Sequence, residues 1–360
     1  MLLGTFELCF IIIFVYQKRY NMHIRILLLS IILITGFIFP QNTSHSLTLD
    51  ENFPLWLKSG ESRSDQTSGI TFIKSDGGID YFLLADDIGD LHLLSIKADK
   101  ILSIEKIEFV NDTQNFFATF PKKDFEEVAY DKETGELYLS VEGNGEYYND
   151  FLGIFKLIFK NRDIFTKQVI AIIRVNFRPQ NLFFKYTAPN VGYEGFSFDN
   201  NFFYLGLEGF QKDNLFADST LVFIANRTDM QIIKTISTKQ YGIYTICGLY
   251  SDQDYSLWGV DRNNRKIFHF IFDKNFNVTD FESLPLTTEI PGFKELNYLP
   301  SFESITFDDK NNIYVVDDPW KQVFVPEKGI FEKLDENTKL NFKNYIPTIF
   351  KYKITPKGDK

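Results

Sequence analysis

The feature that most restricts the possible folds of this chain is a short phrase that occurs five times. Each copy starts with a polar residue and continues as a strand of alternating residues, and four of the five copies end in Asp. The copies are Ser68 to Phe72, Glu126 to Asp131, Glu194 to Asp199, Cys247 to Asp252 and Glu303 to Asp308. Self-similarity at a period of roughly 40 to 60 residues is typical of propellers and other stacked arrays. The repeats therefore predict an array of small, similar sheets.

A second apolar strand follows each phrase after a short loop, and it ends in an acid. These second strands are Phe82 to Asp87, Leu137 to Glu142, Phe203 to Glu208, Leu257 to Asp261 and Ile313 to Asp318. The chain contains 39 Phe and 18 Tyr, and aromatic residues favour strands over helices. Helical periodicity is almost absent after the N-terminal region, so the sequence predicts an all-β protein.

We expect four antiparallel strands in each repeat. In the first three repeats they are Ile70–Ile73, Tyr81–Ala85, Leu91–Ile96, Ile101–Val110; Glu127–Tyr130, Glu136–Val141, Gly153–Phe159, Val169–Val175; and Phe196–Phe198, Phe202–Leu207, Thr220–Ala225, Ile232–Ile236. In the last two they are Gly248–Tyr250, Ser256–Val260, Lys266–Phe272, Val278–Leu284; and Ile305–Phe307, Asn312–Val316, Thr348–Lys353. The fifth repeat lacks a fourth strand, which we expect Ser46–Leu49 to supply because joining both chain ends in one sheet protects its open edges.

These units predict a single β-propeller domain over residues 46–354, with five four-stranded antiparallel blades. Six blades are the alternative, if the long interval between Glu126 and Glu194 holds an irregular extra blade. We expect residues 355–360 to be a disordered tail.

The N-terminal region has the features of an export signal. His23 and Arg25 precede an apolar run from Ile26 to Phe39, which is short for a membrane span and typical of a signal peptide. We therefore assign residues 22–45 to a signal peptide and short linker, and residues 1–21 to an upstream extension or mis-called start. We expect an exported protein, periplasmic or extracellular, with no stable membrane span in the mature form; an uncleaved anchor is the alternative.

Net charge and cysteine content limit the classes of partner and the disulfides that we expect. The formal net charge is −10, and the absence of a basic patch argues against nucleic acid as a partner. Cys9 and Cys247 are the two cysteines, so removal of Cys9 with the signal leaves no intrachain disulfide. No triad-hydrolase, zinc or phosphate-loop motif occurs. We expect a monomer that binds a small molecule or an envelope ligand.

The ends of the strands predict a site. In a propeller the first strand of each blade lines the central channel and the second runs antiparallel to it, so the start of the first and the end of the second lie on one face. The predicted inner ring is Glu126, Glu194 and Glu303, with Ser68 and Cys247 at equivalent positions. The predicted outer ring is Asp86, Glu142, Glu208, Asp261 and Asp317, with Asp87 and Asp318 as neighbouring alternatives. Because converging carboxylates repel one another, we expect a hard cation, above all Ca²⁺.

Structural roles are the alternative for the same residues. Asp261 and the pair Asp317 and Asp318 fit turn formers that cap nearby amides, and the inner-ring Glu residues fit acceptors that join neighbouring blades. Three cations near second-strand ends are candidate ligands for a phosphate group: Arg262, Arg265 and Lys321. His92 and His269 lie within strands, where we expect them to pack.

At these residues the sequence resembles the phytase-like β-propeller family, named for the "esterase-like activity of phytase" domain. The resemblance covers about residues 66–354 and rests on Ser68–Ile70, Asp124–Ala129, Glu194–Gly195 and Glu303–Ile305, with Glu127 where the family usually has Gly. It implies an exported, metal-dependent propeller hydrolase. Glu194–Gly195 is also similar to the metal-binding Glu-Gly of gluconolactonase-type propellers, although Phe196 stands where they usually have Pro.

Two functions remain open at this stage. The first is Ca²⁺-dependent hydrolysis of phosphate or carboxylic esters at an acidic site on one face of the channel. The second is a calcium-stabilised propeller without enzymatic activity, acting as a binding or scaffold module in the cell envelope. In that case aromatic residues beside the acids would contact the partner, namely Tyr147, Tyr148 and Trp320.

Overall fold

The computed structural model describes residues 45–212, 215–216, 218–253, 255–319 and 324–356. The described residues all belong to one compact unit. The predicted upstream extension, the signal peptide up to residue 44, Trp320, Lys321 and residues 357–360 lie outside the described residues. The predicted export therefore stays a prediction.

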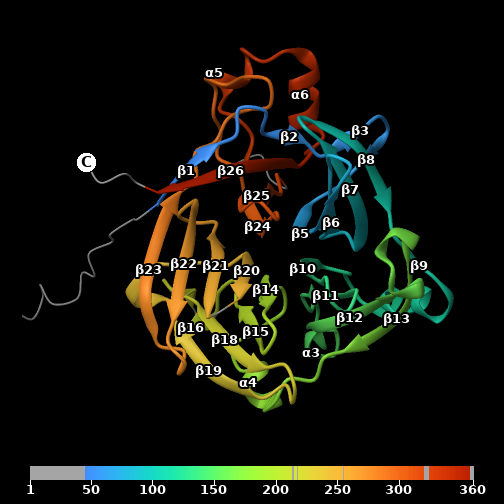
Figure 1. Ribbon diagram of the computed structural model, residues 1–360, viewed down its shortest axis with the longest axis vertical. Coiled ribbons are helices and arrows are strands. Elements are labelled where there is room, and N and C mark those ends of the chain that lie inside the picture. The colour runs from blue at the N-terminus through green and yellow to red at the C-terminus, as the bar shows by residue number, and fades with distance from the viewer. Residues whose placement is uncertain (1–44, 213–214, 217, 254, 320–323, 357–360) are drawn as a thin grey trace, which may run out of the picture. The chain divides into compact units, whose positions relative to one another are not determined.

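Five antiparallel sheets stand around a common centre, each with its first strand innermost (Figure 1). Blade 1 contains β5 (Thr67–Asp76), β6 (Ile79–Asp86), β7 (Asp90–Lys97) and β8 (Lys100–Lys106). Blade 2 contains β10 (Phe125–Asp131), β11 (Glu136–Val141), β12 (Gly153–Phe159) and β13 (Gln168–Arg174), with β9 (Glu108–Phe109) added in parallel to β13. Blade 3 contains β14 (Gly195–Phe198), β15 (Phe202–Gly206), β18 (Leu221–Asn226) and β19 (Ile232–Ser237).

The remaining two blades complete the ring. Blade 4 contains β20 (Gly248–Gln253), β21 (Ser256–Asp261), β22 (Lys266–Phe272) and β23 (Val278–Pro285). Blade 5 contains β24 (Phe302–Phe307), β25 (Asn312–Asp317), β26 (Thr348–Pro356) and β1 (His45–Leu49), while β2 (Leu55–Trp56) also pairs with β26. The all-β propeller with five blades is confirmed, and within the described residues no sixth blade lies between Glu126 and Glu194.

The ring closes as the sequence predicts. The N-terminal strand β1 pairs antiparallel with the C-terminal strand β26, with Leu47 opposite Ile354. Both ends of the folded unit thus belong to one sheet, and separating them requires breaking a full strand pairing. The predicted boundary at residue 354 falls two residues before the end of β26.

Several elements outside the blades were not expected from the sequence. They are the helices α3 (Tyr148–Phe151), α4 (Gln180–Phe183), α5 (Lys328–Phe331) and α6 (Glu336–Lys343), and the hairpins β3 (Lys58–Ser59) with β4 (Ser62–Arg63) and β16 (Gln211–Lys212) with β17 (Leu215–Phe216). The 3₁₀ turns span Asn111–Asn115, Phe117–Thr119, Lys160–Arg162, Ile164–Thr166 and Lys239–Tyr241. Asp335 caps α6 by accepting from the backbone N–H of Thr338 at 2.8 Å. Among the described residues, no helix has the length and apolar character needed to cross a membrane.

The core consists of five apolar clusters, and each cluster joins two neighbouring blades. Strand β15 shows why its sequence is apolar on both sides. Phe203 and Leu205 pack in the cluster shared with blade 2, whereas Tyr204 packs in the cluster shared with blade 4. Because successive side chains of a strand point to opposite faces, a blade between two others needs apolar residues at every position.

The inner strands pack closely at the second position of the repeated phrase, which holds Gly or Ser in four blades. A Cβ added to Gly69 would lie 2.7 Å from the backbone oxygen of Glu126, so the small residue allows close approach. In blade 2 this position is Glu127, which is 1% exposed. Its carboxylate accepts from Ser304 Oγ of blade 5 at 2.6 Å, and so it bridges the centre of the ring where the other blades present no long side chain.

Candidate functional site

One end of the central channel opens into a cavity of about 360 Å³, which we call the acidic pocket. It lies where the inner strands begin and the second strands end. Its lining residues are Gln66, Ser68, Asp87, Lys122, Asp124, Glu126, Glu142, Asn190, Glu194, Glu208, Arg262, Glu303 and Asp318. The structure therefore brings the three inner-ring residues predicted from the sequence, Glu126, Glu194 and Glu303, into one pocket. Cavities of this size are large enough for a small ligand.

The predicted outer-ring acids fall into two sets, which occupy adjacent positions at the ends of the second strands. Aligned on the second strands, the residue that lines the pocket is Asp87, Glu142, Glu208, Arg262 or Asp318 in blades 1 to 5. The predictions Glu142 and Glu208 thus fall on the pocket. Asp86, Asp261 and Asp317 are one residue earlier, and because the side-chain period of a strand is two, they point away from it.

Those three earlier acids are bound by the protein itself. Asp86 accepts from Ser64 Oγ at 2.5 Å and contacts His92 Nε2 at 3.0 Å. Asp317 accepts from Thr348 Oγ1 at 2.7 Å and from the hydroxyl of Tyr298 at 2.8 Å.

Asp261 is bound in the same manner. Its Oδ2 accepts from Asn264 Nδ2 at 2.7 Å and from the backbone N–H of Tyr244 at 3.2 Å. The structural alternative, a capping acid beside a turn, describes the surroundings of Asp86, Asp261 and Asp317 better than ligation in the pocket.

Eight carboxylates line the acidic pocket, against the two cations Lys122 and Arg262. Arg262 Nη1 donates to both oxygens of Glu303 at 2.7 Å, and its Nη2 is paired with Glu208 and lies 3.8 Å from Glu194 Oε2. The guanidinium is thus already bound by acids, rather than presented to an incoming phosphate group. If all eight carboxylates are ionised, the pocket carries a large negative charge.

Lys122 neutralises the other side of the pocket, where it pairs with Asp87 and Asp124. Although burial lowers the pKa of Lys122, hydrogen bonds and charge from the two carboxylates raise it overall. Burial and the neighbouring Asp87 raise the pKa of Asp124 to about 7, in spite of the lysine. One ammonium group is therefore insufficient for the acids around it.

Four buried carboxylate oxygens in the pocket have no hydrogen-bond partner: Asp87 Oδ1, which is ion-paired with Lys122, Glu142 Oε1, Glu194 Oε2 and Asp318 Oδ1. Glu142 is 2% exposed and Glu194 is 9% exposed. Burial, followed by the charge of neighbouring carboxylates, raises the pKa of both groups well above the ordinary range. Buried polar atoms normally have partners, so these oxygens mark a place where the chain alone does not satisfy its own groups.

Among the residues that the structure describes, three groups of side chains offer ligand atoms that lie within 4.8 Å of one another inside each group. They are Glu142–Glu194–Glu208, Asp87–Asp124–Glu126 and Glu194–Cys247–Glu303. The first group contains two of the partnerless oxygens and consists of oxygen donors alone. Of the predicted trio, Glu194 and Glu303 share the third group, whereas Glu126 belongs to the second, although all three acids line the pocket.

Other predicted residues lie elsewhere. Arg265 is exposed, has a positive φ of 52° and does not line the pocket. Tyr148 donates to the backbone oxygen of Thr187, and Tyr147 is 67% exposed. His269 stacks on Trp258 with ring centroids 3.8 Å apart, in line with its predicted packing role.

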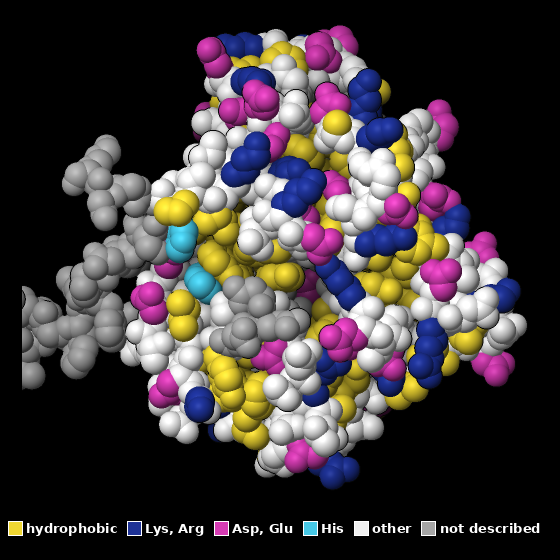
Figure 2. All heavy atoms as spheres, viewed as in Figure 1, with side chains coloured by type: hydrophobic (Ala, Val, Ile, Leu, Met, Phe, Trp, Pro, Cys, Tyr) yellow, Lys and Arg dark blue, Asp and Glu magenta, His cyan; other side chains and the backbone are white. Residues whose placement is uncertain are grey.

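Sequence reasoning did not assign Lys122, Gln66 and Asn190 to the site, and it quoted Asp124 only as part of the family resemblance. All four residues lie outside the repeated strand ends from which the two rings were predicted. The only sequence signal near two of them is that Lys122 and Asp124 directly precede the second copy of the phrase. Figure 2 shows acidic and basic side chains interspersed over the visible face, so the excess of acids is a property of the pocket and not of that surface.

No protein-family model matches this sequence, and no curated protein matches it. Among solved structures it is similar to a PQQ-bound aldose sugar dehydrogenase from Streptomyces coelicolor, at 8% identity over 88% of this chain and 100% of that one, with a TM-score of 0.45. It is similar to a luciferin-regenerating enzyme at 12% identity over 80% and 78% of the two chains, with a TM-score of 0.38. A virginiamycin B lyase from Staphylococcus aureus aligns at 13% identity over 75% and 67%, with a TM-score of 0.33. We transfer no residue role from these structures.

Proposed function

We propose that this protein is a Ca²⁺-dependent ester hydrolase of the phytase-like kind, with its site in the acidic pocket. The observation that carries the proposal is the pair of partnerless oxygens, Glu142 Oε1 and Glu194 Oε2, in a pocket with eight carboxylates and two cations. A buried carboxylate without a partner is costly, and a cation is the most direct compensation.

The residues fit Ca²⁺ in chemistry and spacing. Ca²⁺ takes six to eight oxygen ligands at about 2.3–2.6 Å, so its ligand atoms lie no more than about 5 Å apart. Glu142, Glu194 and Glu208 offer oxygens within 4.8 Å of one another. The amide of Asn190 lines the same cavity and is available as a further oxygen donor.

Bound Ca²⁺ would supply Lewis-acid polarisation of an ester oxygen and would lower the pKa of a water molecule. The chain supplies the rest of the site. Arg262 holds Glu303 and Glu208 in place by charge-assisted bonds, which fixes the side of the pocket next to the cation. Lys122 holds Asp87 and Asp124 on the other side. Glu126, which belongs to none of these ion pairs, is the candidate proton acceptor.

The test begins with calcium binding measured as a shift in melting temperature. A ligand at a hundredfold its dissociation constant stabilises the folded state by about 2.7 kcal/mol. Glu194→Gln keeps the shape of the side chain and removes one ligand charge, so it should lose most of the calcium-induced shift. In chelator the variant should match the wild type closely or exceed it in stability, since an unpaired buried charge is gone.

A panel of phosphate and carboxylic ester substrates, run with and without calcium, then separates the two functions. Calcium-dependent turnover that Glu194→Gln abolishes supports the hydrolase. A calcium shift without turnover on any substrate supports the binding or scaffold module instead. If millimolar Ca²⁺ leaves the wild-type melting curve unchanged, the protein does not bind Ca²⁺ in this pocket and the proposed mechanism is wrong.

A further inference from the structure

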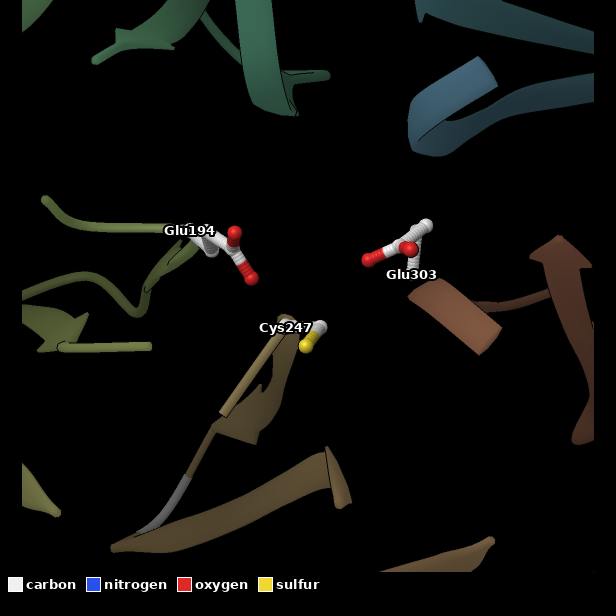
Figure 3. A group of neighbouring side chains, drawn as sticks. All are labelled: Glu194, Cys247 and Glu303. Atoms are coloured by element: carbon white, nitrogen blue, oxygen red, sulfur yellow. The ribbon is translucent and has the colours of Figure 1, made fainter. Parts of the chain in front are cut away.

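A second group of possible ligands adjoins the acidic pocket and has a different chemistry, because one of its members is a thiol: Glu194 and Glu303 line the pocket, whereas Cys247 lies buried beside it. Glu194, Cys247 and Glu303 come from blades 3, 4 and 5, and Figure 3 shows the two carboxylates directed toward each other with the sulfur between them. Their ligand atoms lie within 4.8 Å of one another, and all three side chains are buried. We call this group the thiol corner.

Two of the three donors of the thiol corner, Glu194 and Cys247, are weakly occupied by the protein, whereas Glu303 accepts hydrogen bonds from Arg262 and from Ser301 Oγ. Glu194 Oε2 has no hydrogen-bond partner, and its nearest cation atom is Arg262 Nη2 at 3.8 Å. Cys247 Sγ has one hydrogen bond, a long contact of 3.8 Å to Thr245 Oγ1. A buried carboxylate oxygen therefore faces a buried thiol, and neither has a strong partner in the chain.

We propose that the thiol corner binds a thiophilic divalent cation, of which Zn²⁺ and Cd²⁺ are the representatives. Zn²⁺ accepts Cys sulfur at about 2.3 Å and carboxylate oxygen at about 2.0–2.2 Å, and soft thiolate ligands select such ions over Ca²⁺. The all-oxygen group Glu142–Glu194–Glu208 has the opposite preference. A hard site in the pocket and a soft site beside it thus lie next to each other and share Glu194.

Binding at the thiol corner involves a proton and a cation of the chain. Burial raises the pKa of the Cys247 thiol well above its ordinary range, so the sulfur keeps its proton until a metal replaces it. The S–H bond breaks, a sulfur–metal bond forms, and one proton leaves to solvent. Arg262 must release Glu303, which it can do while it stays paired with Glu208. The corner therefore responds to a thiophilic ion and stays a neutral thiol otherwise.

The two sites share Glu194. If Glu194 is a Ca²⁺ ligand, which rests on the proposed function, a thiophilic ion at the corner takes this carboxylate from the calcium site. Zn²⁺ or Cd²⁺ should then oppose calcium binding, although the two ions prefer different neighbours. The thiol corner would act as an inhibitory metal site beside the acidic pocket.

The test uses the full-length chain with Cys9→Ser, so that Cys247 is the only thiol. Cd²⁺ is titrated in the absence of Ca²⁺ while the ultraviolet thiolate-to-metal charge-transfer absorbance is recorded. We expect saturation at one Cd²⁺ per chain and loss of the band in the further variant Cys247→Ser. Ser is the natural residue at the equivalent position of blade 1, Ser68, so the variant should fold. A wild-type titration without the band overturns the proposal, as does a saturable band that persists in Cys247→Ser.

A crossed control separates this inference from the proposed function. Glu208→Gln removes a donor of the oxygen group that is absent from the thiol corner, so it should weaken the calcium shift and keep the cadmium band. Cys247→Ser should do the reverse. In the wild type, Cd²⁺ should weaken the apparent affinity for Ca²⁺, read from the calcium-induced shift in melting temperature, at least tenfold. In Cys247→Ser, Cd²⁺ should leave this affinity unchanged. A cadmium–thiolate band without a calcium-induced shift in melting temperature would contradict the calcium proposal alone. A calcium-induced shift without the band would contradict the thiol corner alone.

Discussion

Both ends of the central channel carry acidic side chains, but the two ends differ in whether the buried carboxylate oxygens have hydrogen-bond partners in the chain. At the end opposite the acidic pocket, a cavity of about 180 Å³ includes Asp131, Asp199 and Arg227 in its lining. Asp131 Oδ2 accepts from Arg227 at 2.9 Å, and Asp199 Oδ2 accepts from the hydroxyl of Tyr204 at 2.8 Å. Neither acid has a buried oxygen without a partner among the described residues. At the acidic pocket, four such oxygens are left.

The pKa values express the same contrast. Burial raises the pKa of acids at both ends, but at Asp131 the hydrogen bonds from Arg227 and two backbone N–H groups outweigh burial and lower it. At Asp124 burial and Asp87 prevail and raise the pKa to about 7. The opposite end thus uses its acids to hold the fold together, while the acidic pocket keeps acids at a cost in stability. Residues retained at such a cost are candidates for function.

Removing the arginine at each end should give the largest change in the free energy of unfolding. The two substitutions can be compared directly because both side chains are 17% exposed. Arg262→Met leaves Glu303 and Glu208 without their cation, and breaking a buried ion pair costs about 3–5 kcal/mol. That loss should be measured by urea unfolding in chelator, and added Ca²⁺ should recover part of it. Arg227→Met should cost about 1–3 kcal/mol through unpaired acceptors, with or without Ca²⁺.

The contrast between the two arginine variants is itself the control. Equal recovery of both variants by Ca²⁺ would mean that the ion stabilises the propeller somewhere other than the acidic pocket. No recovery of Arg262→Met would mean that the carboxylates freed by the substitution do not attract a cation.

The next effect is the pH dependence of stability in chelator. An acid with a raised pKa keeps its proton in the folded state over a pH range in which the unfolded chain has lost it. Stability is then fully present below the ordinary pKa and is lost as pH rises. For Asp124 this range runs from its ordinary value of 3.8 to about 7, at up to about 1.4 kcal/mol per pH unit. Asp124→Asn cannot titrate, so the fall in the free energy of unfolding between pH 4 and pH 7 should become shallower.

Asp131 at the opposite end should show the reverse sign. Its lowered pKa contributes stability that is present above the ordinary value and is lost as pH falls below it. Asp131→Asn should therefore leave the slope between pH 4 and pH 7 unchanged and should flatten the loss of stability below pH 4. Identical profiles for the two variants would contradict the difference between the ends.

The sequence predicted the five blades, their closure by β1 and β26, and the location of the inner ring, because these follow from periodicity and from the alternation along strands. It did not predict which residue at the end of a second strand faces the channel. In blades 1 and 5 two adjacent acids end the strand, Asp86 with Asp87 and Asp317 with Asp318. Composition does not distinguish them, since a shift of one residue reverses every side chain.

Helix α6 and the role of Lys122 could not be predicted from the sequence for another reason. Both lie in insertions between the repeated strands, where no periodicity applies. The repeat therefore predicted the frame of the pocket, with Arg262 near a second-strand end, but not Lys122. Arg262 was noticed as a cation near a strand end, but its pairing with Glu303 depends on the neighbouring blade.

The smallest effect is expected at Asp261, next to Arg262, and it tests the one-residue shift directly. Asp261 is 2% exposed and accepts from Asn264 Nδ2 and from the backbone N–H of Tyr244 through one oxygen. Asp261→Asn keeps an acceptor for these donors but turns the other oxygen, which accepts from the backbone N–H of Asn264, into a donor. One net hydrogen bond is lost, so we expect a decrease of about 1 kcal/mol in the free energy of unfolding. The decrease should be the same in calcium and in chelator, because Asp261 does not line the acidic pocket. If Asp261→Asn instead loses the calcium-induced shift as Glu194→Gln should, the pocket-facing register assigned to blade 4 is incorrect.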